Sequence, residues 1–141
     1  MRSDKSEVSE VASDLFRFAQ KRRLFMTESI VFEKSKIFAV RIVKMSNYLK
    51  KCKKEFIMSD QLIRAGTSIG ANIAEAESAI NRKDFTAKMY IAYKECSEAK
   101  YWLYVLYHSG YLTSTQYNSV NNDCVEIEKI LTAITKRMRT E

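Results

Sequence analysis

The fold is decided by the stretch from residue 84 to residue 108, DFTAKMYIAYKECSEAKYWLYVLYH. Its apolar residues recur every three or four positions, the spacing that places side chains on one face of an α-helix. They are Phe85, Met89, Ala92, Cys96, Ala99, Leu103 and Leu106. Gly110 lies just beyond this stretch and suits the left-handed conformation that often ends a helix. The stretch therefore predicts a long amphipathic helix with one face in a core.

Three further stretches show the same spacing. In the stretch from about residue 28 to residue 49, the apolar positions are Val31, Phe38, Ile42, Met45 and Leu49, and Ser35 fills a gap. In the stretch from about residue 59 to residue 80, they are Leu62, Ala65, Ile69, Ile73 and Ala76. From residue 113 to the end they are Tyr117, Val120, Cys124, Ile127, Leu131, Ile134 and Met138. Four helices of similar length with short connections predict an all-α, antiparallel up-down-up-down four-helix bundle.

Local signals suggest where these helices begin and end. Residue 59 or 60 is the expected N-cap of the second helix, and Thr113 with Gln116 fits a capping box before the last. Residues 50–55 are predicted to form a charged loop, with residues 56 and 57 folding back onto the end of the bundle.

Proline and glycine are scarce. The 141 residues include no proline and three glycines, which argues against β-sandwiches and loop-rich folds. Two of the glycines, Gly66 and Gly70, lie inside the second predicted helix, where each costs about 1 kcal/mol relative to alanine. Close approach of a neighbouring helix is the expected compensation.

The chain is predicted to have two parts. Residues 1–25 form an N-terminal extension in which Val8, Val11, Leu15 and Phe18 have helical spacing, so a short amphipathic helix is plausible there. Residues 26–141 form the bundle domain.

The net charge of +7 indicates a surface that attracts polyanions. Most of this excess lies on the first helix and the loop after it, and basic residues form two clusters at opposite ends of the expected bundle. One contains Lys44, Lys50, Lys51, Lys53 and Lys54, and the other contains Arg82, Lys83, Lys136, Arg137 and Arg139, near Lys34. Each cluster is a candidate nucleic-acid site or an ordinary solvated helix end. No apolar run spans a bilayer and no signal peptide is evident, so we expect a cytoplasmic protein with no membrane partner.

No motif for catalysis, metal binding or cofactor binding occurs in the sequence. The three cysteines form no CxxC pair and there is one histidine, so we expect no disulfide scaffold, no metal and no cofactor. The second helix carries polar residues beside its apolar stripe: Gln61, Arg64, Ser68, Asn72 and Glu75. They form either an interhelical hydrogen-bond network or a ligand site. A line of tyrosines includes Tyr90, Tyr93, Tyr101 and Tyr104. It indicates either a subunit interface or rings that cover the edge of the core with their hydroxyl groups in water.

The run QLIRAGTSIGANIAEA, residues 61–76, resembles the signature of the four-helix-bundle proteins encoded in intervening sequences of bacterial 23S rRNA genes. Asp84-Phe85, residues 90–95, residues 98–102 and the turn at residues 109–112 fit the same family. The resemblance covers about residues 28–138 and leaves the extension outside.

The resemblance implies a homopentamer without catalysis, and it gives the polar residues of the second helix no settled role. A related accessory protein of diversity-generating retroelements is a basic pentamer that binds nucleic acid and a reverse transcriptase. Our first hypothesis is therefore a non-catalytic oligomer that binds structured RNA or DNA. The alternative is a protein scaffold or accessory subunit, for example of a reverse transcriptase, and an enzyme is a distant third.

Overall fold

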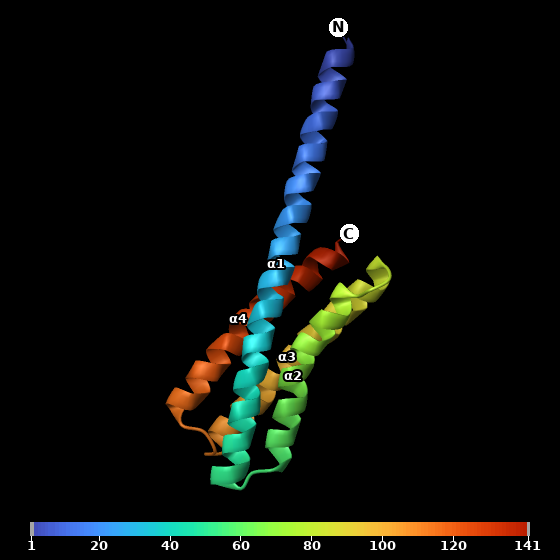
Figure 1. The fold of residues 1–141 in the computed structure, drawn as a ribbon. Helices are drawn as coiled ribbons and strands as arrows, with labels where there is room; N and C mark the ends of the chain where they lie inside the picture. Colours follow the sequence, from blue (N-terminus) through green and yellow to red (C-terminus); the bar gives the residue numbers. More distant parts are fainter. Residues whose placement is uncertain (1, 141) are drawn as a thin grey trace. The chain divides into compact units, whose positions relative to one another are not determined.

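The computed structural model describes residues 2–140, which form four α-helices (Figure 1). The helices are α1 (Arg2–Lys53), α2 (Ile57–Glu77), α3 (Arg82–His108) and α4 (Ser114–Arg139). The chain divides into two compact units, residues 1–30 and residues 31–141. Within the second unit the helices run alternately up and down, which confirms the predicted all-α four-helix bundle.

The core consists of the apolar stripes that the spacing predicts. All five predicted apolar positions of α2 and six of the seven in α3 are buried. The partly buried positions, which lie at the edges of the core, are Met45, Phe85, Tyr117 and Met138. Because each helix contributes one continuous stripe, the bundle has a single hydrophobic core.

The seam between α1 and α2 is very narrow at the two helical glycines. A Cβ atom built on Gly66 would lie 2.8 Å from Cγ2 of Ile42, and one built on Gly70 would lie 3.1 Å from Oγ of Ser35. The backbone carbonyl carbon of Ser35 is 3.7 Å from that same Gly70 position. The expectation that these glycines allow a neighbouring helix to approach is confirmed.

The first helix is longer than its apolar stripe predicts. The expected helix over about residues 28–49 and the possible separate N-terminal helix are one continuous helix of 52 residues, Arg2–Lys53. No proline or glycine interrupts it, and basic residues in its last turn are favoured by the helix dipole. It ends where Lys54 adopts a left-handed conformation with φ of 55°. No helix in the described part of the chain is long and apolar enough to cross a membrane.

The start of α2 also differs from the expectation. The helix begins at Ile57, and neither residue 59 nor residue 60 caps it. Instead, the carboxylate of Glu55, which is 7 % exposed, accepts hydrogen bonds from three backbone N–H groups at 2.7–3.1 Å. These belong to residues 57, 58 and 59. The prediction that residues 56 and 57 fold back onto the bundle is wrong, because Phe56 is 53 % and Ile57 is 80 % exposed.

The turn between α3 and α4 follows the sequence signals. Gly110 has φ of 87° and its N–H donates to the carbonyl of Tyr107, while the N–H of Tyr111 donates to the carbonyl of Leu106. Thr113 and Gln116 form the predicted capping box, with bonds of 3.1 and 2.9 Å. These ends confirm the predicted stop of α3 and start of α4.

The first and last helices of the bundle are held together by polar contacts. Arg41 on α1 pairs with Asp123 on α4 and donates to the hydroxyl of Ser119 at 2.6 Å. Lys34 pairs with Glu126 at 2.8 Å. The four helices therefore close into a ring around the core.

Candidate nucleic-acid interface

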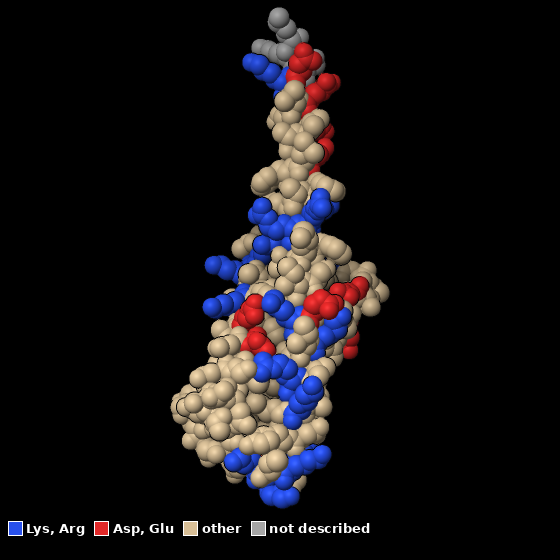
Figure 2. Space-filling model, turned by 60° about the vertical axis from the view of Figure 1, so that its left-hand side comes forward, with Lys and Arg blue, Asp and Glu red and all other residues tan. Residues whose placement is uncertain are grey.

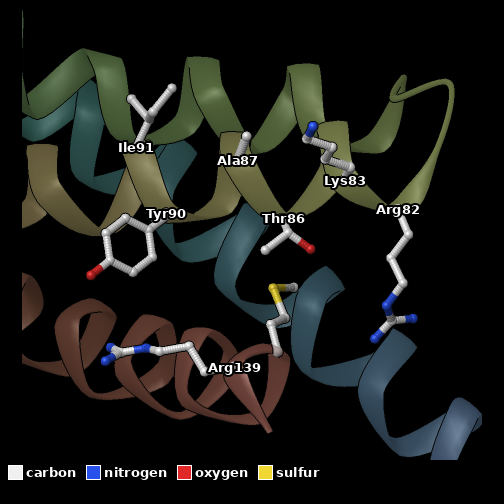
Figure 3. Close-up of a pocket in the computed structure, with 8 residues that line it drawn as sticks. Arg82, Lys83, Thr86, Ala87, Tyr90, Ile91 and Arg139 are labelled. Atoms are coloured by element: carbon white, nitrogen blue, oxygen red, sulfur yellow. The ribbon is translucent and has the colours of Figure 1, made fainter. Parts of the chain in front are cut away.

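An open groove of about 830 Å³ lies where the start of α3 meets the end of α4 (Figure 3). Its apolar lining includes Ala87 and Ile91 of α3 and Met138 of α4. Lys83 of α3 and Arg139 of α4 also line the groove and supply positive charge. The groove can therefore offer both apolar contact and cations to one ligand.

An aromatic ring beside this groove lies close to two cations. Tyr90 lines the groove, and its ring centroid is 5.6 Å from the guanidinium carbon of Arg139. The ammonium group of Lys94 lies 5.6 Å from the same centroid. An aromatic ring near two cations suits a flat, negatively charged ligand such as a nucleotide, whose base stacks while its phosphate pairs.

The predicted cluster of Lys50, Lys51, Lys53 and Lys54 lies at the end of the bundle where α1 passes into α2, and Figure 2 shows Lys and Arg side chains gathered there. Lys51, Lys53 and Lys54 are exposed, and in the described residues none of them pairs with a carboxylate. Lys50 differs because its ammonium group lies 2.5 Å from Asp60. The predicted loop is wrong for residues 50–53, since these lysines belong to the last turn of α1.

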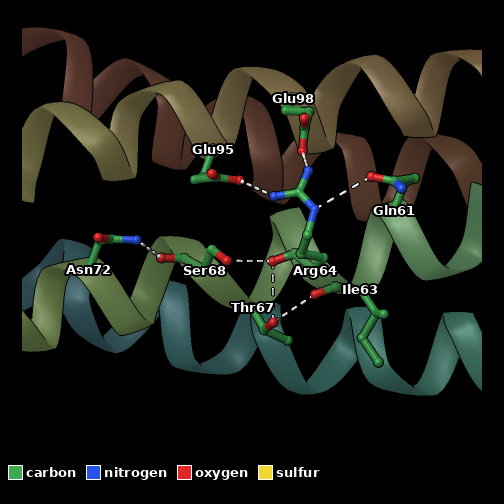
Figure 4. Close-up of polar contacts among 8 residues, drawn as sticks. All are labelled: Gln61, Ile63, Arg64, Thr67, Ser68, Asn72, Glu95 and Glu98. Atoms are coloured by element: carbon green, nitrogen blue, oxygen red, sulfur yellow. Dashed lines mark hydrogen bonds and ion pairs between the residues drawn. The ribbon is translucent and has the colours of Figure 1, made fainter.

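The polar residues of α2 divide into separate contacts (Figure 4). Arg64 bridges to α3 through Glu95, at 3.2 Å, and through Glu98, and Gln61 accepts from its Nε at 3.4 Å. Ser68 donates to the carbonyl of Arg64 at 2.6 Å. This part of the row binds α2 to α3 and to itself.

The far end of the row pairs in the same way. Asn72 donates to the carbonyl of Ser68 at 2.8 Å, and Glu75 pairs with Lys88 of α3 at 2.8 Å. The hydrogen bond and the charge of Glu75 raise the pKa of the Lys88 ammonium group. In the part of the chain that the structure describes, only Arg64 and Glu75 of the row make polar contacts with another helix, because the bonds of the other three residues stay within α2.

Comparisons with known proteins agree with this architecture. The model of the 23S rRNA-intervening sequence protein family matches residues 27–133. The chain belongs to this family. A crystal structure from Bacteroides thetaiotaomicron VPI-5482, described as a protein with unknown function from the S23 ribosomal protein family, is 51% identical. The match has a TM-score of 0.76 and covers 78% of this chain and 98% of that one. No curated protein matches the chain.

In this member of the 23S rRNA-intervening sequence protein family, the second predicted cluster is only partly assembled. Arg82, Lys83 and Arg139 line one groove, and Lys136 and Arg137 are exposed on the last turns of α4. Lys34 is occupied by Glu126 and so adds no free charge to the cluster.

Two residues at the groove belong to neither of the predicted basic clusters. Tyr90 was a predicted interface or core-edge residue, and Lys94 belongs to neither predicted cluster. The sequence spacing could have predicted that Tyr90 lies beside Lys83. Thr86 and Tyr90 follow Lys83 at intervals of three and four residues and therefore share its helix face. What the sequence of this family member does not reveal is that α4 ends opposite that face.

Proposed function

We propose that this protein is a non-catalytic basic oligomer that binds structured RNA or DNA. One observation carries the proposal: the groove between α3 and α4 combines an apolar lining, the ring of Tyr90 and the cations Lys83 and Arg139. Cations neutralise phosphates, and a base that leaves its stack in a loop or at an end can stack on an aromatic ring. Structured RNA with unpaired bases is the ligand that fits both features.

The lysines at the end of α1 supply a second, purely electrostatic surface. Lys51, Lys53 and Lys54 have no ring beside them among the cation–aromatic pairs of the described residues. They are expected to position a nucleic-acid backbone without reading its sequence.

Salt titrations of binding by fluorescence anisotropy test the proposal. The ligands are an RNA hairpin, a single-stranded RNA and a DNA duplex. Each lost phosphate contact lowers the slope of log K against log salt by about 0.9 on a duplex and about 0.7 on a single strand. The double variant Lys83→Gln/Arg139→Gln should therefore lose nearly two units of slope on the duplex if both cations touch phosphates.

Two matched variants locate the contact. Tyr90→Leu keeps the charge and the apolar volume but removes the stacking ring, so it should weaken the hairpin complex and spare the slope. Lys36→Gln/Lys129→Gln removes the same charge from residues that do not line the groove, and it should change affinity little. The proposal fails if wild type does not bind at low salt, or if both double variants lose the same affinity and slope.

A second candidate function, a protein scaffold, is favoured by apolar side chains on the outside of the bundle. On α1, Ile37 is 63 % and Val40 is 56 % exposed, and on α3, Tyr101 is 57 % and Tyr104 is 54 % exposed. Such faces are typical of subunit contacts. We expect them to be covered in a homopentamer, as the family resemblance implies.

Light scattering coupled to size-exclusion chromatography tests the assembly. A pentamer has a mass of about five times 16.4 kDa, whereas a monomer at every concentration would contradict it. If nucleic-acid binding fails while the pentamer holds, the scaffold becomes the leading function, with another protein as its partner.

A further inference from the structure

The first part of α1 carries an apolar row with every member open to solvent. Val8, Val11, Leu15 and Phe18 are 59–68 % exposed, and every side chain from residue 4 to residue 23 is exposed. Their spacing of three, four and three residues is the heptad spacing of a helix that packs against another helix. This segment precedes the residues that the family model matches, so the family does not account for it.

A charged residue continues this row at each end. Asp4 stands four residues before Val8, and Arg22 stands four residues after Phe18. The two side chains therefore lie on the apolar face itself, one acidic and one basic. Both are exposed.

The remaining charges of the segment are divided in the same way. From residue 4 to residue 14 there are four carboxylates and one lysine, and from residue 17 to residue 23 there are four cations and no carboxylate. Figure 2 shows acidic side chains on the first part of this helix and basic ones farther along. Two copies of this segment in antiparallel orientation would therefore place the acidic part of each against the basic part of the other.

We propose that residues 4–22 dock in antiparallel orientation on the same segment of a second copy of the chain. In one register, Asp4 faces Arg22 of the second copy, Val8 faces its Phe18 and Val11 faces its Leu15. Every apolar residue of the row then meets an apolar partner, and each end closes with an ion pair.

Two further features support this orientation. Ala12 and Ala19 flank the row, and their small side chains allow two helices to lie close together. A parallel pair would instead place Arg22 against Arg22 and Asp4 against Asp4, and like charges in direct contact are destabilising.

A charge-swap cycle on the full chain tests the orientation. The association is followed by sedimentation velocity over a concentration series. In Arg22→Glu, two carboxylates face each other at each end, and in Asp4→Lys, two cations do. Each single variant should raise the dissociation constant about tenfold or more, and the double variant should restore it. In a parallel pair, neither single variant removes the repulsion, so an unchanged constant would overturn the proposal.

Disulfide cross-linking gives an independent readout in a Cys52→Ser background, which removes the exposed cysteine. In the proposed register, residue 12 lies close to residue 12 of the second copy, whereas the two copies of residue 19 lie far apart. With a mild oxidant, Ala12→Cys should form a cross-linked dimer and Ala19→Cys should not. If Ala12→Cys fails to cross-link, or if Ala19→Cys cross-links as efficiently, the proposed register is wrong.

The row itself is tested by Val11→Ser/Phe18→Ser, which leaves the bundle untouched. This variant should keep the mass of the assembly that the bundles form. It should lose the further association, through paired N-terminal segments, that wild type shows as the concentration rises. If wild type shows no such step, the proposal is wrong. It is also wrong if wild type keeps the variant's mass and binds phosphatidylserine vesicles through the row, since the row would then be a membrane surface. None of these readouts depends on nucleic-acid binding.

Discussion

Replacing Gly66 with alanine is expected to destabilise the bundle, although alanine is the better helix former. In an isolated helix, Gly66→Ala would stabilise by about 1 kcal/mol. In this bundle the added Cβ would lie 2.8 Å from Cγ2 and 2.9 Å from Cγ1 of Ile42. Carbon atoms in favourable contact lie about 3.5–4.0 Å apart, so the overlap is about 0.6 Å or more.

Ile42 has no room to give way. Its side chain is 0 % exposed and both of its γ-carbons meet the new atom. The two helices must therefore move apart locally, and such overpacking costs about 1–3 kcal/mol. After the gain in helix propensity, the net loss is on the order of 1 kcal/mol. In a chain of this length that loss lowers Tm by about 3 °C.

Urea denaturation followed by circular dichroism, at one fixed protein concentration, measures this loss. Ala71→Gly is the control, because residue 71 is exposed on α2 and the change should cost about 1 kcal/mol through helix propensity alone. Ile42→Ala removes both γ-carbons and leaves its Cβ as the nearest atom of that residue, 3.2 Å from the added carbon. In that background, Gly66→Ala should cost at least about 1 kcal/mol less than in wild type. A Gly66→Ala protein that gains as much stability as Ala71→Gly loses would refute the argument for a tight seam.

Three other outcomes can be measured. A hydrogen bond from the Cys96 thiol to Cys124, together with burial, raises the pKa of the Cys96 thiol. A thiol reagent at neutral pH should therefore modify one cysteine in the folded protein, Cys52, and three in denaturant. The carboxylate of Glu128 on α4 accepts a hydrogen bond from the Lys100 ammonium group and raises the pKa of that group above its usual 10.5. The stability that this pair contributes is present below that pH and lost above it, so alkaline thermal melts should fall more steeply for wild type than for Lys100→Gln. Glu55→Ala leaves three N–H groups at the start of α2 without their acceptor and should cost about 1–3 kcal/mol in urea denaturation.

Sequence reasoning succeeds where structure depends on neighbouring residues. The apolar spacing of α3, the capping box at Thr113 and the left-handed Gly110 are local features, and all are found as predicted. Close packing at Gly66 was also predictable, because two helix-breaking glycines one turn apart need a reason.

The errors have physical causes. The run of lysines at the end of α1 was interpreted as a loop, yet a helix C-terminus favours positive charge and tolerates it. Glu55 caps α2 from a buried position, and glutamate is not among the residues that normally signal an N-cap.

At the candidate site, too, some features could be predicted from the sequence and others could not. Lys83 and Arg139 were correctly assigned to one end of the bundle, because helix direction alone determines that end. The pairing of Lys34 with Glu126 joins residues far apart in the sequence, and no local pattern predicts which carboxylate faces which lysine.

The contacts between α1 and α4 make the packing of the helices independent of which helices the loops connect. Arg41 with Asp123 and Lys34 with Glu126 join helices that no loop connects, so neighbouring helices touch all the way around the core. No single connection is then needed to keep a helix in its place. The bundle is accordingly a scaffold that could be circularly permuted, with new chain ends opened in a turn such as residues 78–81 between α2 and α3.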